Sequence, residues 1–134
     1  MANNWILIWY SSNNAGTVVI RVCPLAAVPD GIVRMLEVVG ADLKPLRLLV
    51  LRETERVWGY ENRCPHFGVP LAAKEQQLIF EPGVSLTCNT HYARFRWRDG
   101  VCDRGDCEGE ALTAVALSVS AGWVVLNDTP RGPD

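Results

Sequence analysis

Short apolar runs, each ended by proline, glycine or polar residues, recur along the chain. Runs of this length that are rich in β-branched and aromatic residues predict β-strands. The predicted strands cover residues 17–23, 32–39, 46–52, 56–62, 77–81, 85–88, 93–97 and 123–126. No long stretch repeats its apolar positions every 3.6 residues, as an amphipathic helix does. The pattern therefore predicts an all-β fold, either a sandwich or a barrel.

Two dipeptides in the C-terminal half predict hairpin turns. Asp99-Gly100 follows an apolar strand, and Asp-Gly readily adopts the positive φ angles of a type I′ turn. Ala121-Gly122 separates a run of alternating apolar and small residues from the last predicted strand. Both positions are expected to join antiparallel neighbours.

The chain has 134 residues, the usual size of one domain. We predict a single domain over residues 17–127. Residues 1–16 are expected to form an N-terminal extension, because they end in the polar stretch Ser-Ser-Asn-Asn-Ala-Gly. Residues 128–134 contain prolines and a glycine and are expected to form a flexible tail.

Charge and hydropathy narrow the class of protein. A net charge of −2 argues against a nucleic-acid partner, since domains that grip phosphate backbones are strongly basic. The apolar stretches are shorter than the roughly 18 residues of a membrane-spanning helix, and residues 5–10 lack the flanking features of a secretory signal. We therefore expect a cytoplasmic protein with no membrane partner, whose five cysteines are thiols or metal ligands. The oligomeric state stays open.

Both histidines of the chain lie close to cysteines. They occur in Cys64-Pro65-His66 and Cys88-Asn89-Thr90-His91, a C-x-H pair followed after 21 residues by a C-x-x-H pair. Two thiolates and two imidazoles make a mixed sulfur and nitrogen donor set for a metal. One alternative is that no metal is bound, and that the cysteines are a buried thiol pair with two incidental histidines. The other is a structural zinc site, although zinc fingers space these ligands differently.

Three segments make the chain resemble the Rieske [2Fe–2S] ferredoxins of the low-potential, oxygenase-associated type. Residues 64–71 resemble the first cluster loop, residues 86–100 the second, and residues 105–112 the loop that covers the cluster. The resemblance implies three antiparallel sheets with one [2Fe–2S] cluster at the tip of two loops. It also implies that Cys64 and Cys88 bind one iron, that His66 and His91 bind the other, and that both histidine edges lie near solvent.

Four positions distinguish the chain from another class of Rieske proteins. Rieske proteins of respiratory complexes carry an extra disulfide and two hydroxyl groups on cluster sulfurs. The matching positions here are Val69 and Thr90 for the disulfide, and Ala93 and Phe95 for the hydroxyls. Because hydrogen bonds to sulfur stabilise the reduced cluster, their loss predicts a low reduction potential. Residues 74–83 are expected to form an extra excursion beside the cluster.

The resemblance implies a one-electron carrier with no catalytic residues. Its electron donor would be a flavoprotein reductase and its electron acceptor a terminal oxygenase. A small Rieske-like subunit of a larger oxidoreductase, such as a nitrite reductase, is the alternative. A redox or iron sensor is the third hypothesis, but it needs an output domain that 134 residues do not provide.

Other residues carry secondary hypotheses. Cys102 and Cys107 are five residues apart, so a disulfide between them is sterically allowed, although buried thiols are expected in a cytosolic chain. Arg94, Arg96 and Arg98 alternate along one strand. They form either a solvated strand face or a basic rim that steers an acidic partner toward the cluster.

Overall fold

The computed structural model describes residues 10–12, 18–39, 45–65 and 68–128. Within them the fold is all-β and consists of three four-stranded antiparallel sheets, which confirms the predicted class. The first sheet has the order β1 (Tyr10–Ser12), β2 (Val18–Pro24), β12 (Trp123–Asp128), β11 (Leu117–Ser120). The second has the order β10 (Ala114–Val115), β5 (Arg56–Glu61), β4 (Pro45–Glu53), β3 (Val33–Val39). The third has the order β6 (Ile79–Glu81), β7 (Ser85–Thr87), β8 (Arg94–Arg96), β9 (Cys102–Arg104).

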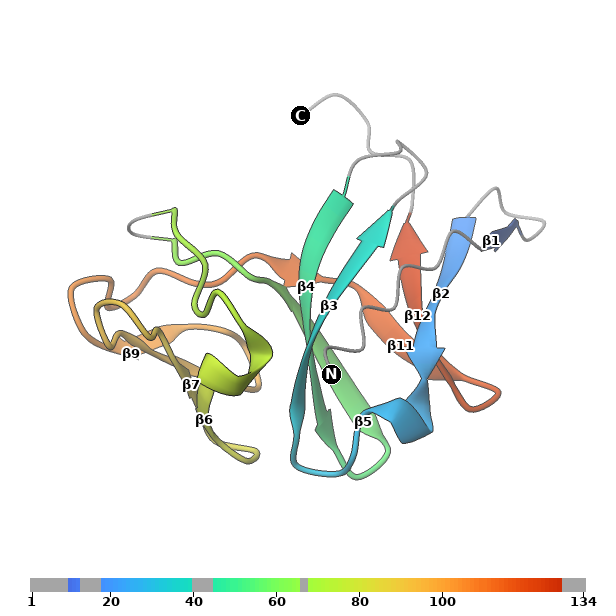
Figure 1. Ribbon diagram of the computed structural model, residues 1–134, viewed down its shortest axis with the longest axis horizontal. Coiled ribbons are helices and arrows are strands. Elements are labelled where there is room, and N and C mark those ends of the chain that lie inside the picture. Colours follow the sequence, from blue (N-terminus) through green and yellow to red (C-terminus); the bar gives the residue numbers. More distant parts are fainter. Residues whose placement is uncertain (1–9, 13–17, 40–44, 66–67, 129–134) are drawn as a thin grey trace.

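The second sheet lies in the middle of the molecule and is buried on both faces (Figure 1). Strand β4 shows why. Successive side chains of a strand point to opposite faces, so Leu48 and Val50 pack against the first sheet while Leu49 and Leu51 face the third. All four are fully buried. A strand buried on both faces has a continuous apolar sequence rather than an alternating one.

The third sheet and its loops form a separate lobe beside the second sheet (Figure 1). The largest buried side chains of this lobe are Trp97 and Phe95, both fully excluded from solvent. The Tyr60 hydroxyl on β5 donates a 2.6 Å hydrogen bond to the Trp97 carbonyl, and Trp58 meets Trp97 edge-on with ring centroids 6.5 Å apart. These contacts join the lobe to the central sheet.

Most predicted strands are confirmed to within two residues at their ends. The Asp99-Gly100 turn needs a correction. β8 and β9 do pair, but the connection is longer than a two-residue type I′ turn, and only Gly100 has a positive φ, of 71°. Asp99 instead accepts hydrogen bonds from the Arg96 guanidinium and the Val101 N–H. At the other hairpin, Ala121 and Gly122 both have positive φ, as a type I′ turn requires.

Two further segments make contacts with the sheets. Residues 10–12, assigned to the N-terminal extension, form β1 and pair with β2. The excursion at 74–83 contains the 3₁₀ helix η2 (Glu75–Gln77), which turns back to the central sheet. There Glu75 accepts hydrogen bonds from the Met35 N–H at 2.9 Å and from Arg34 at 3.1 Å.

The remainder of the predicted extension and tail, residues 1–9, 13–17 and 129–134, lies outside the described residues. Of the helices in the described ranges, none is long and apolar enough to cross a membrane.

Candidate metal centre

Three of the four predicted metal ligands lie in loops that follow two strands of neighbouring sheets. Cys64 follows β5, and Cys88 and His91 follow β7. Both thiols are fully buried, in the same apolar cluster, whereas His91 is exposed. His66 lies outside the described residues. In the described ranges no group of three or more His, Cys, Asp or Glu side chains is placed to hold a metal ion.

The two cysteine loops have the same backbone hydrogen bonds. The Cys64 N–H donates to the Val69 carbonyl at 2.7 Å, and the Cys88 N–H donates to the Ala93 carbonyl at 2.8 Å. In each loop the residue four positions after the cysteine donates back to the cysteine carbonyl, from Gly68 at 2.8 Å and from Tyr92 at 2.9 Å. The chain therefore closes both loops with the same pair of hydrogen bonds and presents a buried thiol from each.

This loop geometry needs a left-handed residue at its fourth position after the cysteine. Gly68 occupies it in the first loop with φ of 71°, and Tyr92 occupies it in the second with φ of 59°. Glycine adopts this conformation without strain, whereas a residue with a Cβ pays about 1–2 kcal/mol. The Tyr92 side chain is 65% exposed, so packing inside the fold compensates little of that cost.

A buried amide closes the first loop. Asn62, 5% exposed, precedes the loop, and its Oδ1 accepts from the Leu71 N–H at 2.9 Å while its Nδ2 donates to the Ala72 carbonyl at 3.1 Å. The Leu71 carbonyl in turn accepts from the Asn89 N–H at 2.7 Å, in the second loop. Asn62 thus fixes both ends of the first loop, and Leu71 ties that loop to the second.

The third loop, after β9, packs on the second. A Cβ at Gly105 would lie 3.0 Å from the Ala93 Cα and 3.2 Å from its Cβ, and Gly105 has φ of 115°, so glycine permits this close approach. Further along, Cys107 is buried beside Cys102, with their sulfurs 2.9 Å apart. Burial first, and then the neighbouring Cys102, raise the pKa of the Cys107 thiol to about 12. Cys64 contributes to the same shift.

The donors of the two loops fit a [2Fe–2S] cluster of the mixed-ligand kind. Two buried thiols from equivalent loops supply one side, and an exposed imidazole three residues after the second thiol suits the other. Zinc binds the same donor types, so the donor types alone do not distinguish a zinc site from a cluster site. All five cysteines are free and buried.

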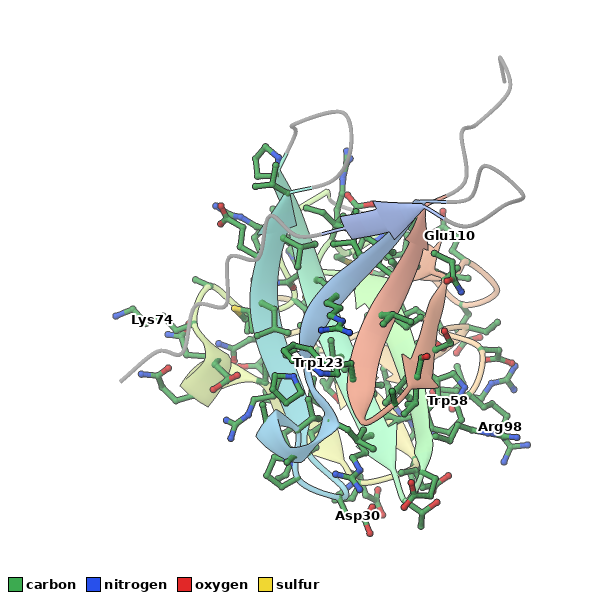
Figure 2. The ribbon with its side chains drawn as sticks, turned by 90° about the vertical axis from the view of Figure 1, so that its right-hand side faces the viewer. Asp30, Trp58, Lys74, Arg98, Glu110 and Trp123 are labelled. Atoms are coloured by element: carbon green, nitrogen blue, oxygen red, sulfur yellow. The ribbon has the colours of Figure 1, made fainter. Side chains whose placement is uncertain are left out.

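The arginines of β8 are paired with carboxylates of their own hairpin. Arg94 contacts Asp103 at 2.8 Å and Arg96 contacts Asp99 at 2.6 Å. These hydrogen bonds lower the pKa of both carboxyl groups. Arg98 is exposed and extends away from the ribbon (Figure 2). The predicted basic rim is therefore partly neutralised, and its steering role stays a prediction.

Sequence reasoning missed Asn62 and Tyr92. Asn62 acts through partners nine and ten residues away, and no local motif marks it. Tyr92 had one usable signal, the internal comparison of the two cysteine loops, which aligns it with Gly68.

Comparisons with known proteins agree with this geometry. The model of the Rieske [2Fe-2S] domain family matches residues 18–119. A search of curated protein sequences finds no match. Among solved structures, the chain is similar to the ferredoxin of carbazole 1,9a-dioxygenase from Nocardioides aromaticivorans IC177. The identity is 20%, the TM-score is 0.65, and the match covers 83% of this chain and 98% of that one.

Oxygenase structures share the same fold over a smaller part of their length. The terminal oxygenase of carbazole 1,9a-dioxygenase from Novosphingobium sp. KA1 is 21% identical with a TM-score of 0.67. The match covers 87% of this chain but 31% of that one. A complex of reduced oxygenase and oxidized ferredoxin in carbazole 1,9a-dioxygenase contains a further match, at 21% identity and TM-score 0.64, which covers 97% of the matched chain.

Proposed function

The chain belongs to the Rieske [2Fe–2S] domain family, whose cofactor is one [2Fe–2S] cluster, and on that premise we propose that it is a one-electron carrier. The cluster, when bound, supplies a one-electron redox change and needs no open coordination position. The protein's own residues then determine how the cluster is held, what covers it and what a partner meets at its surface.

We assign the cluster ligands to Cys64, His66, Cys88 and His91. The support is the pair of equivalent loops, which place both thiols in one apolar cluster and leave His91 at the surface. Burial of the thiols excludes water from the sulfur side. An exposed imidazole gives a partner a short path to the site.

The observation that carries the carrier role is the extent of the structural match. The chain corresponds to 98% of a stand-alone ferredoxin but to about a third of an oxygenase chain. A matching ferredoxin chain also occurs in a complex with its oxygenase. We therefore propose a flavoprotein reductase as donor and a terminal oxygenase as acceptor, in the cytoplasm.

We also propose a low reduction potential, near the bottom of the roughly −150 to +300 mV Rieske range. Ala93 and Phe95 are buried beside the second loop and carry no hydroxyl that could donate to a sulfur. Introducing a hydroxyl by Ala93→Ser is expected to raise the midpoint potential, because the reduced and more negative cluster gains a hydrogen bond. Potentiometric titration of both proteins measures this shift, with Ala73→Ser as a matched exposed control.

Visible absorption, iron and sulfide analysis and low-temperature EPR of anaerobically purified protein test the cofactor and its ligands. Two irons, two sulfides and a rhombic signal after dithionite reduction are expected. Substitution of His66 or His91 by cysteine should change the EPR signal while the protein stays folded. A colourless protein with one bound zinc would refute the redox function, and a midpoint potential well above zero would refute the low-potential assignment.

A further inference from the structure

Strand β9 and the turn after it bring together two buried cysteines outside the proposed ligand set. Cys102 begins β9, and Cys107 lies in the turn that follows. Their Sγ atoms are 2.9 Å apart, and the Cys107 thiol donates to the Cys102 sulfur. A disulfide needs about 2.05 Å, so a small side-chain movement is enough to reach bonding distance.

The backbone around the pair is already fixed in a closed loop. The Cys102 N–H donates to the Glu110 carbonyl at 2.7 Å, and the Glu110 N–H donates to the Cys107 carbonyl at 2.9 Å. The Gly109 N–H donates to the Cys102 carbonyl at 3.1 Å. These bonds hold the two cysteines on facing sides of one closed loop.

Both cysteines belong to the apolar core between the second and third sheets, and each is 2% exposed. Cys23 lies in the other apolar core, between the first and second sheets. Residues 103–106, in the loop between Cys102 and Cys107, are all exposed, so this pair lies where its core meets the surface. A small opening of that loop would therefore bring both sulfurs to solvent. The same loop packs through Gly105 on Ala93, which follows the second cysteine loop.

We propose that Cys102 and Cys107 form a reversible dithiol/disulfide pair, which is a second redox site of the chain. On oxidation each thiol loses one proton and one electron, and the S–S bond forms between the two Sγ atoms. A low-molecular-weight disulfide, such as oxidised glutathione, takes the two electrons and two protons as its own S–S bond breaks into two thiols. Formation of the bridge does not depend on the electron-carrier role.

The bridge would act on the loop that packs over the candidate cluster site. It ties β9 covalently to the turn before Leu112, so the loop can no longer open at Cys107. Closing this loop restricts access from solvent to the apolar core that contains Cys64, Cys102 and Cys107. We therefore expect the oxidised protein to release iron to a chelator several-fold more slowly than the reduced protein.

Peptide mapping of the intact holoprotein tests the bridge. The protein is equilibrated anaerobically in glutathione buffers from fully reduced to fully oxidised, quenched in acid, alkylated and digested with trypsin. Incubation lasts hours, because buried protonated thiols exchange slowly. Trypsin cleaves after Arg104, between the two cysteines, so the bridge links peptides 99–104 and 105–131. We expect this linked pair, with two fewer alkylated thiols, in oxidising buffer and its loss in dithiothreitol.

Variants and the visible spectrum separate the possible outcomes. Cys102→Ser should abolish the linked peptides and make iron release independent of the buffer, whereas Cys23→Ser should change neither. If a variant does not fold, the wild-type map alone decides. Full alkylation of both cysteines in the most oxidising buffer would overturn the proposal, and so would a bridge found only in bleached protein. Equal rates of iron release from the oxidised and reduced forms would overturn the covering role.

Discussion

Replacing Asn62 by alanine tests whether a buried amide holds the first ligand loop closed. The amide makes two hydrogen bonds, with the Leu71 N–H at 2.9 Å and with the Ala72 carbonyl at 3.1 Å. Alanine removes both and leaves two backbone groups at buried residues without these partners. Neither group can reach solvent unless the loop opens.

The size of the effect follows from these contacts. Each hydrogen bond contributes about 1 kcal/mol net, and each buried group left unsatisfied costs about 1–3 kcal/mol. We expect Asn62→Ala to destabilise the closed loop by about 2–4 kcal/mol, allowing for partial relaxation. If opening of this loop limits cluster release, 2 kcal/mol corresponds to roughly 30-fold faster release, because each 1.4 kcal/mol is a factor of ten.

The assay is the loss of visible absorption from anaerobic holoprotein mixed with an excess of iron chelator. Asn127→Ala is the matched control. The Asn127 side chain is exposed and donates a long 3.4 Å hydrogen bond to Ser118 in the first sheet, away from the ligand loops. Its loss should change stability by less than about 0.5 kcal/mol. Equal release rates for Asn62→Ala and Asn127→Ala would refute the role assigned to Asn62.

Two further predictions concern the second cysteine loop and the hydrogen bond that joins the third-sheet lobe to the central sheet. Tyr92→Gly should be more stable than Tyr92→Ala by about 1 kcal/mol, since both remove the side chain but only glycine relieves the positive φ; thermal melts that rank alanine first would contradict this. Tyr60→Phe should lower stability by about 1 kcal/mol through loss of the hydrogen bond to Trp97. Burial, followed by Asp99, raises the pKa of Tyr60 to about 12 from 10.0. The contribution of protonated Tyr60 to the free energy of unfolding is therefore full below pH 10 and is lost as the pH rises toward 12. Tyr60→Phe should show a flatter stability profile across that range, and parallel profiles for the two proteins would count against the shift.

Strand positions could be predicted from the sequence because the central sheet imposes a strong pattern. The run Leu48–Leu51 is apolar at every position, and the structure shows that its two faces serve two different cores. The prediction of a type I′ turn at Asp99-Gly100 was wrong for a reason that is local in the sequence. The Asp99 carboxylate accepts from Arg96 and Val101 and stabilises a longer connection with the left-handed residue at Gly100 only.

The candidate site was predictable only where it is local in sequence. The C-x-H and C-x-x-H spacings identify donor types within a few residues of one another, and the pairing of donor types points to a metal site. What holds the donors in place is not local. Three contacts hold them, and each joins residues at least nine positions apart. They are the hydrogen bonds of Asn62 to Leu71 and Ala72, the hydrogen bond from Asn89 to Leu71, and the close approach of Gly105 to Ala93.

The two cysteine loops show why such long-range support matters for this fold. Among the described residues, two backbone hydrogen bonds close each loop, and one of them depends on a left-handed residue. Gly68 meets that requirement without strain and Tyr92 does not, so the second loop is expected to be the less stable of the two by itself. The third loop packs directly behind it, at Ala93, and so supports the loop that needs it more. A covalent bridge within the third loop would then act where the second loop is weakest. On this reasoning the dithiol pair and the strained Tyr92 position should be coupled. Oxidation of Cys102 and Cys107 should slow iron release from the wild-type protein by a larger factor than from Tyr92→Gly.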